Sequence, residues 1–211
     1  MTEWVGSCDP DRESEALMAV STAVDARRRI LEQTLRLIGE EGIGAVSNRR
    51  VASAAGVALG SLTYHFPSQT QLLREALLLY VQEEVERLQV IAAELRASEP
   101  TAAQVAAEVQ LIVERSSGRL EEVAELELHL QASRDPELQE ASARCFAAYE
   151  EVARAALEAL AVPDPERHAR TVVAVMYGLG LRRLGTGKRD ASGTADALLT
   201  LVQGARAAPG Q

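Results

Sequence analysis

The sequence predicts an all-α protein with about nine or ten helices, arranged as a small N-terminal unit and a larger C-terminal domain. Two observations predict this fold class. The apolar residues are mostly alanine, leucine and valine, and alanine and leucine favour helices. No segment alternates apolar and polar residues as a half-buried strand would, whereas apolar residues recur every three or four positions over long stretches without proline.

The chain begins with a polar, acidic leader, residues 1–20, whose first dozen residues we expect to be disordered. The segment that follows, DARRRILEQTLRLIGEEGIGAVS, has apolar residues at helical spacing. Asp25 can cap the start of this helix, and Gly42 stands where helices commonly end in a left-handed residue. This amphipathic helix opens the N-terminal unit, which we place at residues 21–75.

Two short helices are predicted next. Ser47 is a good N-cap for the first, and Gly56 ends that helix after about two turns. The second, VALGSLTYHF, stops at the proline that follows, because a residue before proline avoids helical angles. Ser68 and Gln71 then have the spacing of a capping box and start a long helix to about residue 98.

The C-terminal domain, residues 76–211, is predicted to continue with helices only. Asp135 and Asp164 each precede a proline, which places an N-cap before a proline at the first helical position. The expected helices span about 102–116, 119–134, 136–161, 165–184 and 193–206.

Charge and cysteine content limit the classes of binding partner and the cellular compartment that we expect. The net charge is −9, which argues against a general polyanion binder, yet residues 27–74 hold seven arginines and three glutamates. A basic segment within an acidic protein indicates a local surface for an anionic partner. Two distant cysteines predict no disulfide framework, and neither a signal peptide nor a membrane-spanning stretch is recognisable. We therefore expect a cytoplasmic protein without membrane association.

The two short helices have the pattern of a helix-turn-helix unit, in which the second helix enters the DNA major groove. Ala58 and Gly60 are small enough for a close backbone approach to DNA. Ser61, Thr63, Tyr64 and His65 offer hydroxyl and ring donors to base edges or phosphates, while the apolar residues at 62 and 66 are expected to anchor the helix to the core.

The segment RRRILEQTLRLIGEEGIGAVSNRRVASAAGVALGSLTYHFPSQTQLL resembles the DNA-binding domain of the tetracycline-repressor (TetR) family over about residues 27–75. The matching motifs are S-x-R-x-V-A at the second helix, A-G-V at the turn and L-x-Y-H-F-x-S at the third helix. The resemblance implies a homodimer whose subunits each join this domain to a variable helical domain that binds a small-molecule effector. Effector binding in such proteins usually releases double-stranded operator DNA.

The resemblance implies DNA contacts from Arg28, Ser47, Arg49, Arg50, Ala58, Gly60, Ser61, Thr63, Tyr64, His65 and Gln69. Two positions depart from the family pattern. Gln69 stands in place of the usual lysine and Thr63 in place of the commoner tyrosine, which predicts weaker sequence-independent attraction. Arginines 27–29 are expected to compensate. For each contact the plainer interpretation is a solvated charge, a surface aromatic or, for His65, a helix cap.

The sequence of the C-terminal domain indicates its binding residues less clearly than the sequence of the N-terminal unit does. Candidate ligand-binding residues are Glu125, His129, Cys145, Phe146 and Tyr149, although each alone is more simply a core or surface group. Candidate dimer-interface residues are Val172, Val175, Met176, Leu179 and Arg183, which recur at helical spacing around glycines 178 and 180. Low aromatic content favours an aliphatic or mixed effector. No set of metal ligands accompanies His129 and His168, so we expect neither metal nor cofactor.

Three functions remain open at this point. A ligand-responsive transcriptional regulator, most often a repressor, explains the motifs best. A helical adaptor that has lost DNA binding would explain the substitutions at positions 63 and 69. An enzyme would need converging catalytic groups, and no Ser-His-Asp signature, glycine-rich phosphate loop or metal motif is present.

Overall fold

The computed structural model describes residues 10–98, 104, 111, 119–187 and 192–207. Within these residues it contains α-helices, one short 3-10 helix and no strand, which confirms the all-α prediction. The helices are α1 (Pro10–Glu41), α2 (Asn48–Ala55), α3 (Leu59–His65), α4 (Gln69–Ser98), α6 (Arg119–Ala132), α7 (Pro136–Ala159), α8 (Pro165–Thr186) and α9 (Ser192–Ala207), with the 3-10 helix at Ile43–Ala45. The helix expected at about 102–116 lies outside the described residues.

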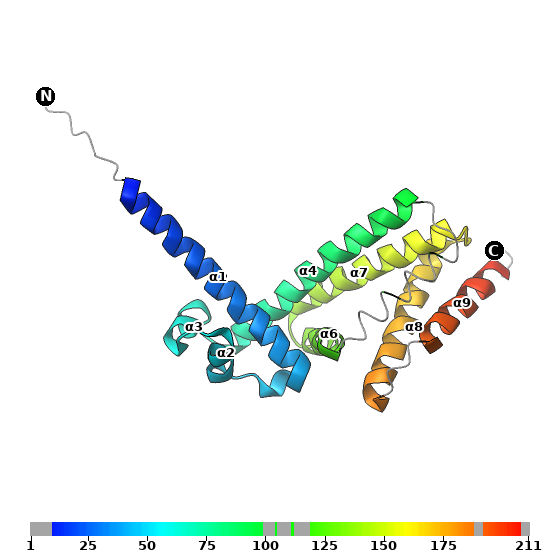
Figure 1. Ribbon diagram of the computed structural model, residues 1–211. Coiled ribbons are helices and arrows are strands. Elements are labelled where there is room, and N and C mark those ends of the chain that lie inside the picture. The colour runs from blue at the N-terminus through cyan, green and yellow to red at the C-terminus, as the bar shows by residue number, and fades with distance from the viewer. Residues whose placement is uncertain (1–9, 99–103, 105–110, 112–118, 188–191, 208–211) are drawn as a thin grey trace, which may run out of the picture.

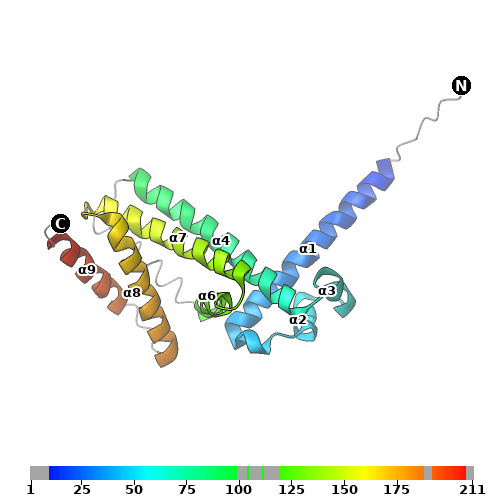
Figure 2. The ribbon, with the colours of Figure 1, turned by 180° about the vertical axis from the view of Figure 1, so that it is seen from behind.

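The helices form an N-terminal unit and a C-terminal bundle that share α4. In Figures 1 and 2, α2 and α3 lie beside α1 at one end, and α4 runs from them into the bundle alongside α7. α8 packs against α7, and α9 packs against α8 at the far end of the molecule. α6 packs against both α1 and α7, so a bundle helix directly contacts the N-terminal unit.

The first helix is longer than the sequence indicated. α1 begins at Pro10, so Asp25 lies inside a continuous helix and its prediction as an N-cap is wrong. The region 10–20, assigned to the leader, is helical as well. No glycine or proline interrupts residues 11–38, and leader residues such as Glu15, Ala16 and Leu17 favour helices. The helix ends just before Gly42, as predicted, but Gly42 (φ 83°, ψ 163°) has a positive φ without adopting the left-handed helical conformation that was expected.

Local signals place α2 and α3 as predicted. The Ser47 hydroxyl accepts a hydrogen bond from the backbone N–H of Arg50, and Gly56 ends α2 in the left-handed conformation (φ 64°, ψ 35°). Leu62 and Phe66 are fully buried, which holds one side of α3 against α2 and α1. α3 has only seven residues, too few for a stable isolated helix, so this burial stabilises its conformation.

The two Asp-Pro helix starts differ. Asp135 caps α7 by accepting the backbone N–H of Glu137, as predicted. Asp164 makes no side-chain cap and adopts φ 49°, so its predicted capping role at α8 is wrong. The tight α7–α8 connection, in which Ala161 also has a positive φ, sets the backbone of Asp164.

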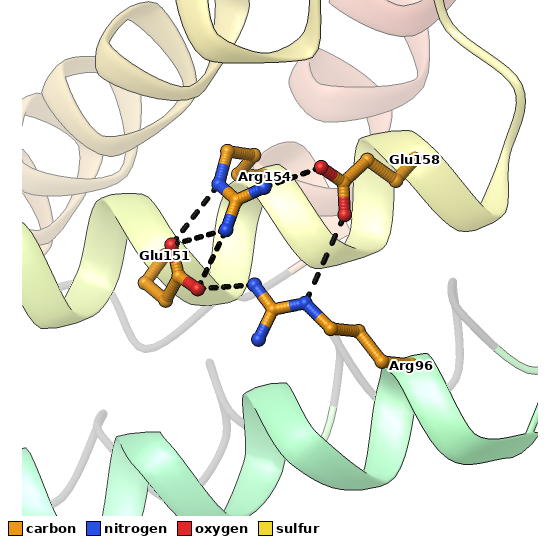
Figure 3. Close-up of polar contacts among 4 residues, drawn as sticks. All are labelled: Arg96, Glu151, Arg154 and Glu158. Atoms are coloured by element: carbon orange, nitrogen blue, oxygen red, sulfur yellow. Dashed lines mark hydrogen bonds and ion pairs between the residues drawn. The ribbon is translucent and has the colours of Figure 1, made fainter.

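The core is continuous from the N-terminal unit into the bundle. Ile30 and Leu37 of α1 belong to the same buried cluster as Leu128 of α6 and Cys145 of α7. At the opposite end of α4, Arg96 forms ion pairs with Glu151 and Glu158 of α7, which Arg154 also contacts (Figure 3). These four side chains are partly exposed, so each pair contributes at most about 1 kcal/mol.

Candidate DNA-binding and effector sites

One face of α3 is open to solvent. Tyr64 is 83% exposed, and Ala58, Gly60 and Thr63 are also exposed, while Ser61 and His65 are partly buried. A side chain added at Gly60 would meet no protein atom, so nothing in this fold obstructs a close approach of DNA there. Thr63 and Tyr64 are exposed and Leu62 and Phe66 are buried, as the sequence predicted, whereas Ser61 and His65, also predicted to contact DNA, are only partly exposed.

Thr63 has a restricted hydrogen-bonding role. Its hydroxyl lies 3.2 Å from the carbonyl oxygen of Leu59 and 3.0 Å from that of Gly60, and donates to them. Because the hydroxyl hydrogen of Thr63 is used within the helix, its oxygen can only accept a hydrogen bond from DNA. Thr63 thus fits a base amino group better than a phosphate oxygen.

The basic residues of the N-terminal unit differ in their availability. Arg50 pairs with Glu41 through both terminal nitrogens, and this hydrogen bonding lowers the pKa of Glu41. Arg28 pairs with Glu32 at 2.8 Å and with Glu83 of α4 at 2.6 Å. These carboxylates already neutralise Arg28 and Arg50, so their contribution to phosphate attraction is reduced.

Arg27 is also paired, with Glu75 of α4. Arg29 and Arg49 are exposed and make no ion pair or side-chain hydrogen bond with any other residue in the described part of the chain. Of arginines 27–29, which were expected to compensate for weaker phosphate attraction at positions 63 and 69, only Arg29 is unpaired in the described chain. Near the α2 N-terminus, Arg49 is the arginine that no carboxylate pairs with in the described chain.

Gln69 has a structural partner. Its side-chain amide donates to the carbonyl oxygen of Val46 at 2.7 Å, immediately before the N-cap Ser47. The amide therefore ties the start of α4 to the start of α2.

A cavity of about 60 Å³ lies between α6 and α8, with contributions from α7 and α9. Glu125 and Tyr149, two of the candidate ligand-binding residues, line it. His129, Cys145 and Phe146 lie next to that wall instead of lining it. The remaining lining residues are Glu122, Leu126, Val173, Met176, Tyr177, Gly180, Leu181, Arg183, Leu184 and Thr194.

Aromatic rings gather beside the cavity despite the low aromatic content of the chain. His129 stacks on Phe146 with 4.4 Å between ring centroids. Tyr177 contacts Phe146 at 4.9 Å and Tyr149 edge-on at 5.8 Å. Sequence reasoning missed Tyr177, although it lies beside the proposed dimer residue Met176. Helix packing brings these rings together from three helices, α6, α7 and α8, which the low aromatic content of the chain did not indicate.

The polar groups at the cavity form a buried network. The Tyr177 hydroxyl donates to Glu125, and the Cys145 thiol lies 3.8 Å from the same carboxyl oxygen. His129 Nε2 lies 3.3 Å from the Tyr177 hydroxyl, and its Nδ1 lies 2.7 Å from the Ser142 hydroxyl. Burial raises the pKa of Glu125 to about 7 and lowers the pKa of His129 to about 4. Both groups are therefore neutral or partly neutral at physiological pH.

Three of the candidate dimer-interface residues make contacts within the chain. Val172 and Met176 pack against buried clusters of the bundle. The Arg183 guanidinium pairs with Glu122 at 2.6 Å and donates to the Thr194 hydroxyl at 2.9 Å. Val175 and Leu179 are partly buried. The outward face of α8, which carries Ala174, Gly178 and Leu181, is the more accessible one for a second subunit.

The described residues contain neither a candidate membrane span nor a candidate metal site. None of the described helices combines the length and apolarity needed to cross a membrane. The described histidine, cysteine and acidic side chains form no group of three or more that could hold a metal ion.

Comparisons with known proteins match both parts of the chain. Residues 30–76 match the family model described as "Bacterial regulatory proteins, tetR family", and residues 100–206 match "Tetracyclin repressor-like, C-terminal domain". The chain is 34% identical over 122 residues to the HTH-type transcriptional repressor KstR of Rhodococcus jostii (strain RHA1), covering 58% of this chain and 48% of that protein. Over its matched residues, the chain thus spans about half the length of this relative.

Solved structures match over most of their length. A TetR-family member from Streptomyces coelicolor A3 is 30% identical, with a TM-score of 0.62 over 83% of this chain and 97% of that one. The multidrug binding protein EbrR, in a complex with ethidium, is 31% identical, with a TM-score of 0.59 over 83% and 97% of the two chains.

Proposed function

Because this chain belongs to the TetR family of bacterial regulatory proteins, we propose that it is a homodimeric transcriptional repressor that a small molecule releases from its operator. The observation that carries this proposal is the exposed face of α3, with Tyr64 83% exposed opposite the fully buried Leu62 and Phe66. Such a helix can enter the major groove without unfolding. The relatives named as repressors, such as KstR, favour repression over activation, and a DNA partner fits a cytoplasmic protein.

The operator contacts follow from which side chains are free. Arg49 and Arg29 attract phosphates, since no carboxylate in the described chain neutralises them. Tyr64 donates to a phosphate, the oxygen of Thr63 faces the bases, and Ala58 and Gly60 allow close approach. In a dimer, two copies of α3 would contact half-sites about 34–36 Å apart.

The same packing offers a route from effector to DNA. α6 lines the cavity through Glu125 and carries Leu128, which packs in the core with Ile30 of α1. α1 in turn holds α3 through the buried Phe66. An effector that displaces α6 would therefore shift α1 and, with it, the spacing of the two recognition helices. The interior is close-packed, so such a displacement cannot be absorbed locally.

The direct test is binding to a promoter fragment from the neighbourhood of the gene, measured by fluorescence anisotropy over a salt series. Arg49→Ala is expected to weaken binding and to lower the slope of log affinity against log salt by about one. Arg144→Ala, on the exposed side of α7, is the matched control and is expected to leave both unchanged. Equal, salt-independent binding of specific and random DNA would contradict the proposal.

The adaptor alternative makes the opposite prediction. If the changes at Thr63 and Gln69 had abolished DNA recognition, no sequence selected from random DNA would bind better than the starting pool. An enzymatic function has no support, because the matching families and relatives are transcriptional regulators.

A further inference from the structure

The charge balance at the cavity leaves one carboxyl group without a cation. Glu84 of α4 accepts from Arg87 at 2.8 Å, and Glu122 pairs with Arg183 at 2.6 Å. Glu125 is 8% exposed, and the groups that hydrogen-bond to it are all neutral: the hydroxyls of Tyr177 and Tyr149 and the thiol of Cys145. No arginine, lysine or histidine of the described chain lies within ion-pair distance of it. A buried carboxylate without a counter-charge is costly, so this wall of the cavity favours a cation.

The other walls suit a cation with an apolar shell. The rings of Tyr149 and Tyr177 both line the cavity and meet edge to face. Aromatic faces attract ammonium groups, most strongly where water is excluded. Leu126, Val173 and Met176 supply the apolar remainder. Methyl or methylene groups on nitrogen would contact these side chains without losing hydrogen bonds.

The cavity disfavours an anion and limits the size of the ligand. Arg183 is the one cation among its described lining residues, and Glu122 already neutralises it. The Arg183 Nε atom is buried without a partner among the described residues, so a ligand hydroxyl could accept from it. The volume of about 60 Å³ is well below the roughly 300 Å³ of drug-sized pockets. A compact head group fits better than a flat polycyclic dye.

From this geometry we propose that the cavity binds a small organic ammonium ion, with the cationic nitrogen at Glu125 and its alkyl groups against Tyr149 and Tyr177. This inference rests on the proposed function, since such an ion would be the effector. It replaces the aliphatic or mixed effector that the composition suggested.

Binding should depend on pH, because the ligand requires the ionised form of Glu125. The groups that interact with this carboxyl are Tyr80 and Glu84 of α4, Cys145 and Tyr149 of α7, and Tyr177 of α8. The other charged or titratable groups nearby are partnered elsewhere: Arg87 pairs with Glu84, Glu122 pairs with Arg183, and His129 contacts Tyr177. Burial, with a smaller contribution from Glu84, raises the pKa of Glu125 to about 7. A bound cation favours the charged form and lowers that pKa. Affinity is therefore expected to fall up to about tenfold per pH unit below 7.

The test compares two isosteric probes, choline and the neutral 3,3-dimethylbutan-1-ol, by isothermal titration calorimetry on the full chain. At pH 8 choline is expected to bind at least tenfold more tightly. Glu125→Gln, which keeps the shape of the side chain and removes its charge, should abolish this preference. Glu127→Gln on the same helix, outside the cavity, is the matched control and should retain it.

Each outcome bears on the proposal. Equal affinities for the two probes, no binding of choline, or a preference that survives Glu125→Gln would overturn it. Operator binding, measured in parallel, distinguishes failure of the ammonium site from failure of the proposed repressor role. A protein that binds its operator specifically but ignores choline refutes the ammonium site and leaves the repressor role intact. A protein that binds choline but no specific DNA refutes the repressor role.

Discussion

Replacing Phe66 by alanine is expected to destabilise the N-terminal unit strongly, whereas replacing its neighbour Tyr64 should barely affect stability. Phe66 is fully buried, and the Arg27 guanidinium lies 5.4 Å from its ring centroid. Truncation of a buried phenylalanine costs about 3–5 kcal/mol, and loss of an exposed cation–π contact adds about 0.5–1 kcal/mol. Tyr64 is 83% exposed, and surface substitutions usually stay within about 0.5 kcal/mol.

Urea unfolding followed by circular dichroism measures this difference, and anisotropy with operator DNA measures its functional counterpart. Phe66→Ala should lower the unfolding midpoint and weaken DNA binding, because α3 loses its anchor. Tyr64→Ala should keep the midpoint and still weaken DNA binding by about tenfold to a hundredfold, since a hydrogen bond to a charged phosphate contributes about 1.5–3 kcal/mol. Equal destabilisation by the two substitutions would refute the assignment of the two faces of α3.

Three further outcomes are expected. Glu41→Gln frees Arg50 from its carboxylate partner and should strengthen binding to random DNA at low salt, measured by anisotropy; unchanged binding would show that Arg50 does not reach phosphate. Gln69→Lys should steepen the salt dependence of DNA binding by about one unit, because it adds a cation at the start of α4; an unchanged slope would show that position 69 does not reach a phosphate. For Glu125, a folded-state pKa near 7 lies above the unfolded value of about 4.3, so its contribution to stability falls as pH rises from about 4 to 7. In urea unfolding at several pH values, Glu125→Gln should remove that fall in stability. His129, whose pKa is lowered to about 4, contributes a slope of stability against pH of the opposite sign in both proteins. Identical pH profiles for the two proteins would refute the buried carboxyl.

Sequence reasoning succeeded where a short-range rule applied. Ser47 and Asp135 cap their helices, and Gly42 and Gly56 adopt positive φ, because each outcome depends on a few neighbouring residues. It failed at Asp164, where a cap motif lies in a connection whose backbone is set by the packing of α7 against α8. The early start of α1 was missed because the capping preference of Asp25 is weaker than continuous helix propensity.

The cavity between α6 and α8 shows most clearly what the sequence could not predict. Glu125 and Tyr149 were candidates, but Tyr177 lies 52 residues beyond Glu125 and no periodic pattern links the two. The same holds for the arginines, whose availability depends on whether a carboxylate from α1 or α4 reaches them. Residue type alone could not separate the paired Arg50 from the unpaired Arg49.

The amino-acid sequence by itself determined the all-α class, the caps and breaks of α2 and α3, and the motifs that place the chain in its family, because these follow from contacts within one or two helical turns. Only the tertiary structure decided which arginines remain uncommitted, which rings meet and which carboxylate is left without a counter-charge. Those properties depend on side chains from different helices approaching within a few ångströms, and burial then sets their ionisation.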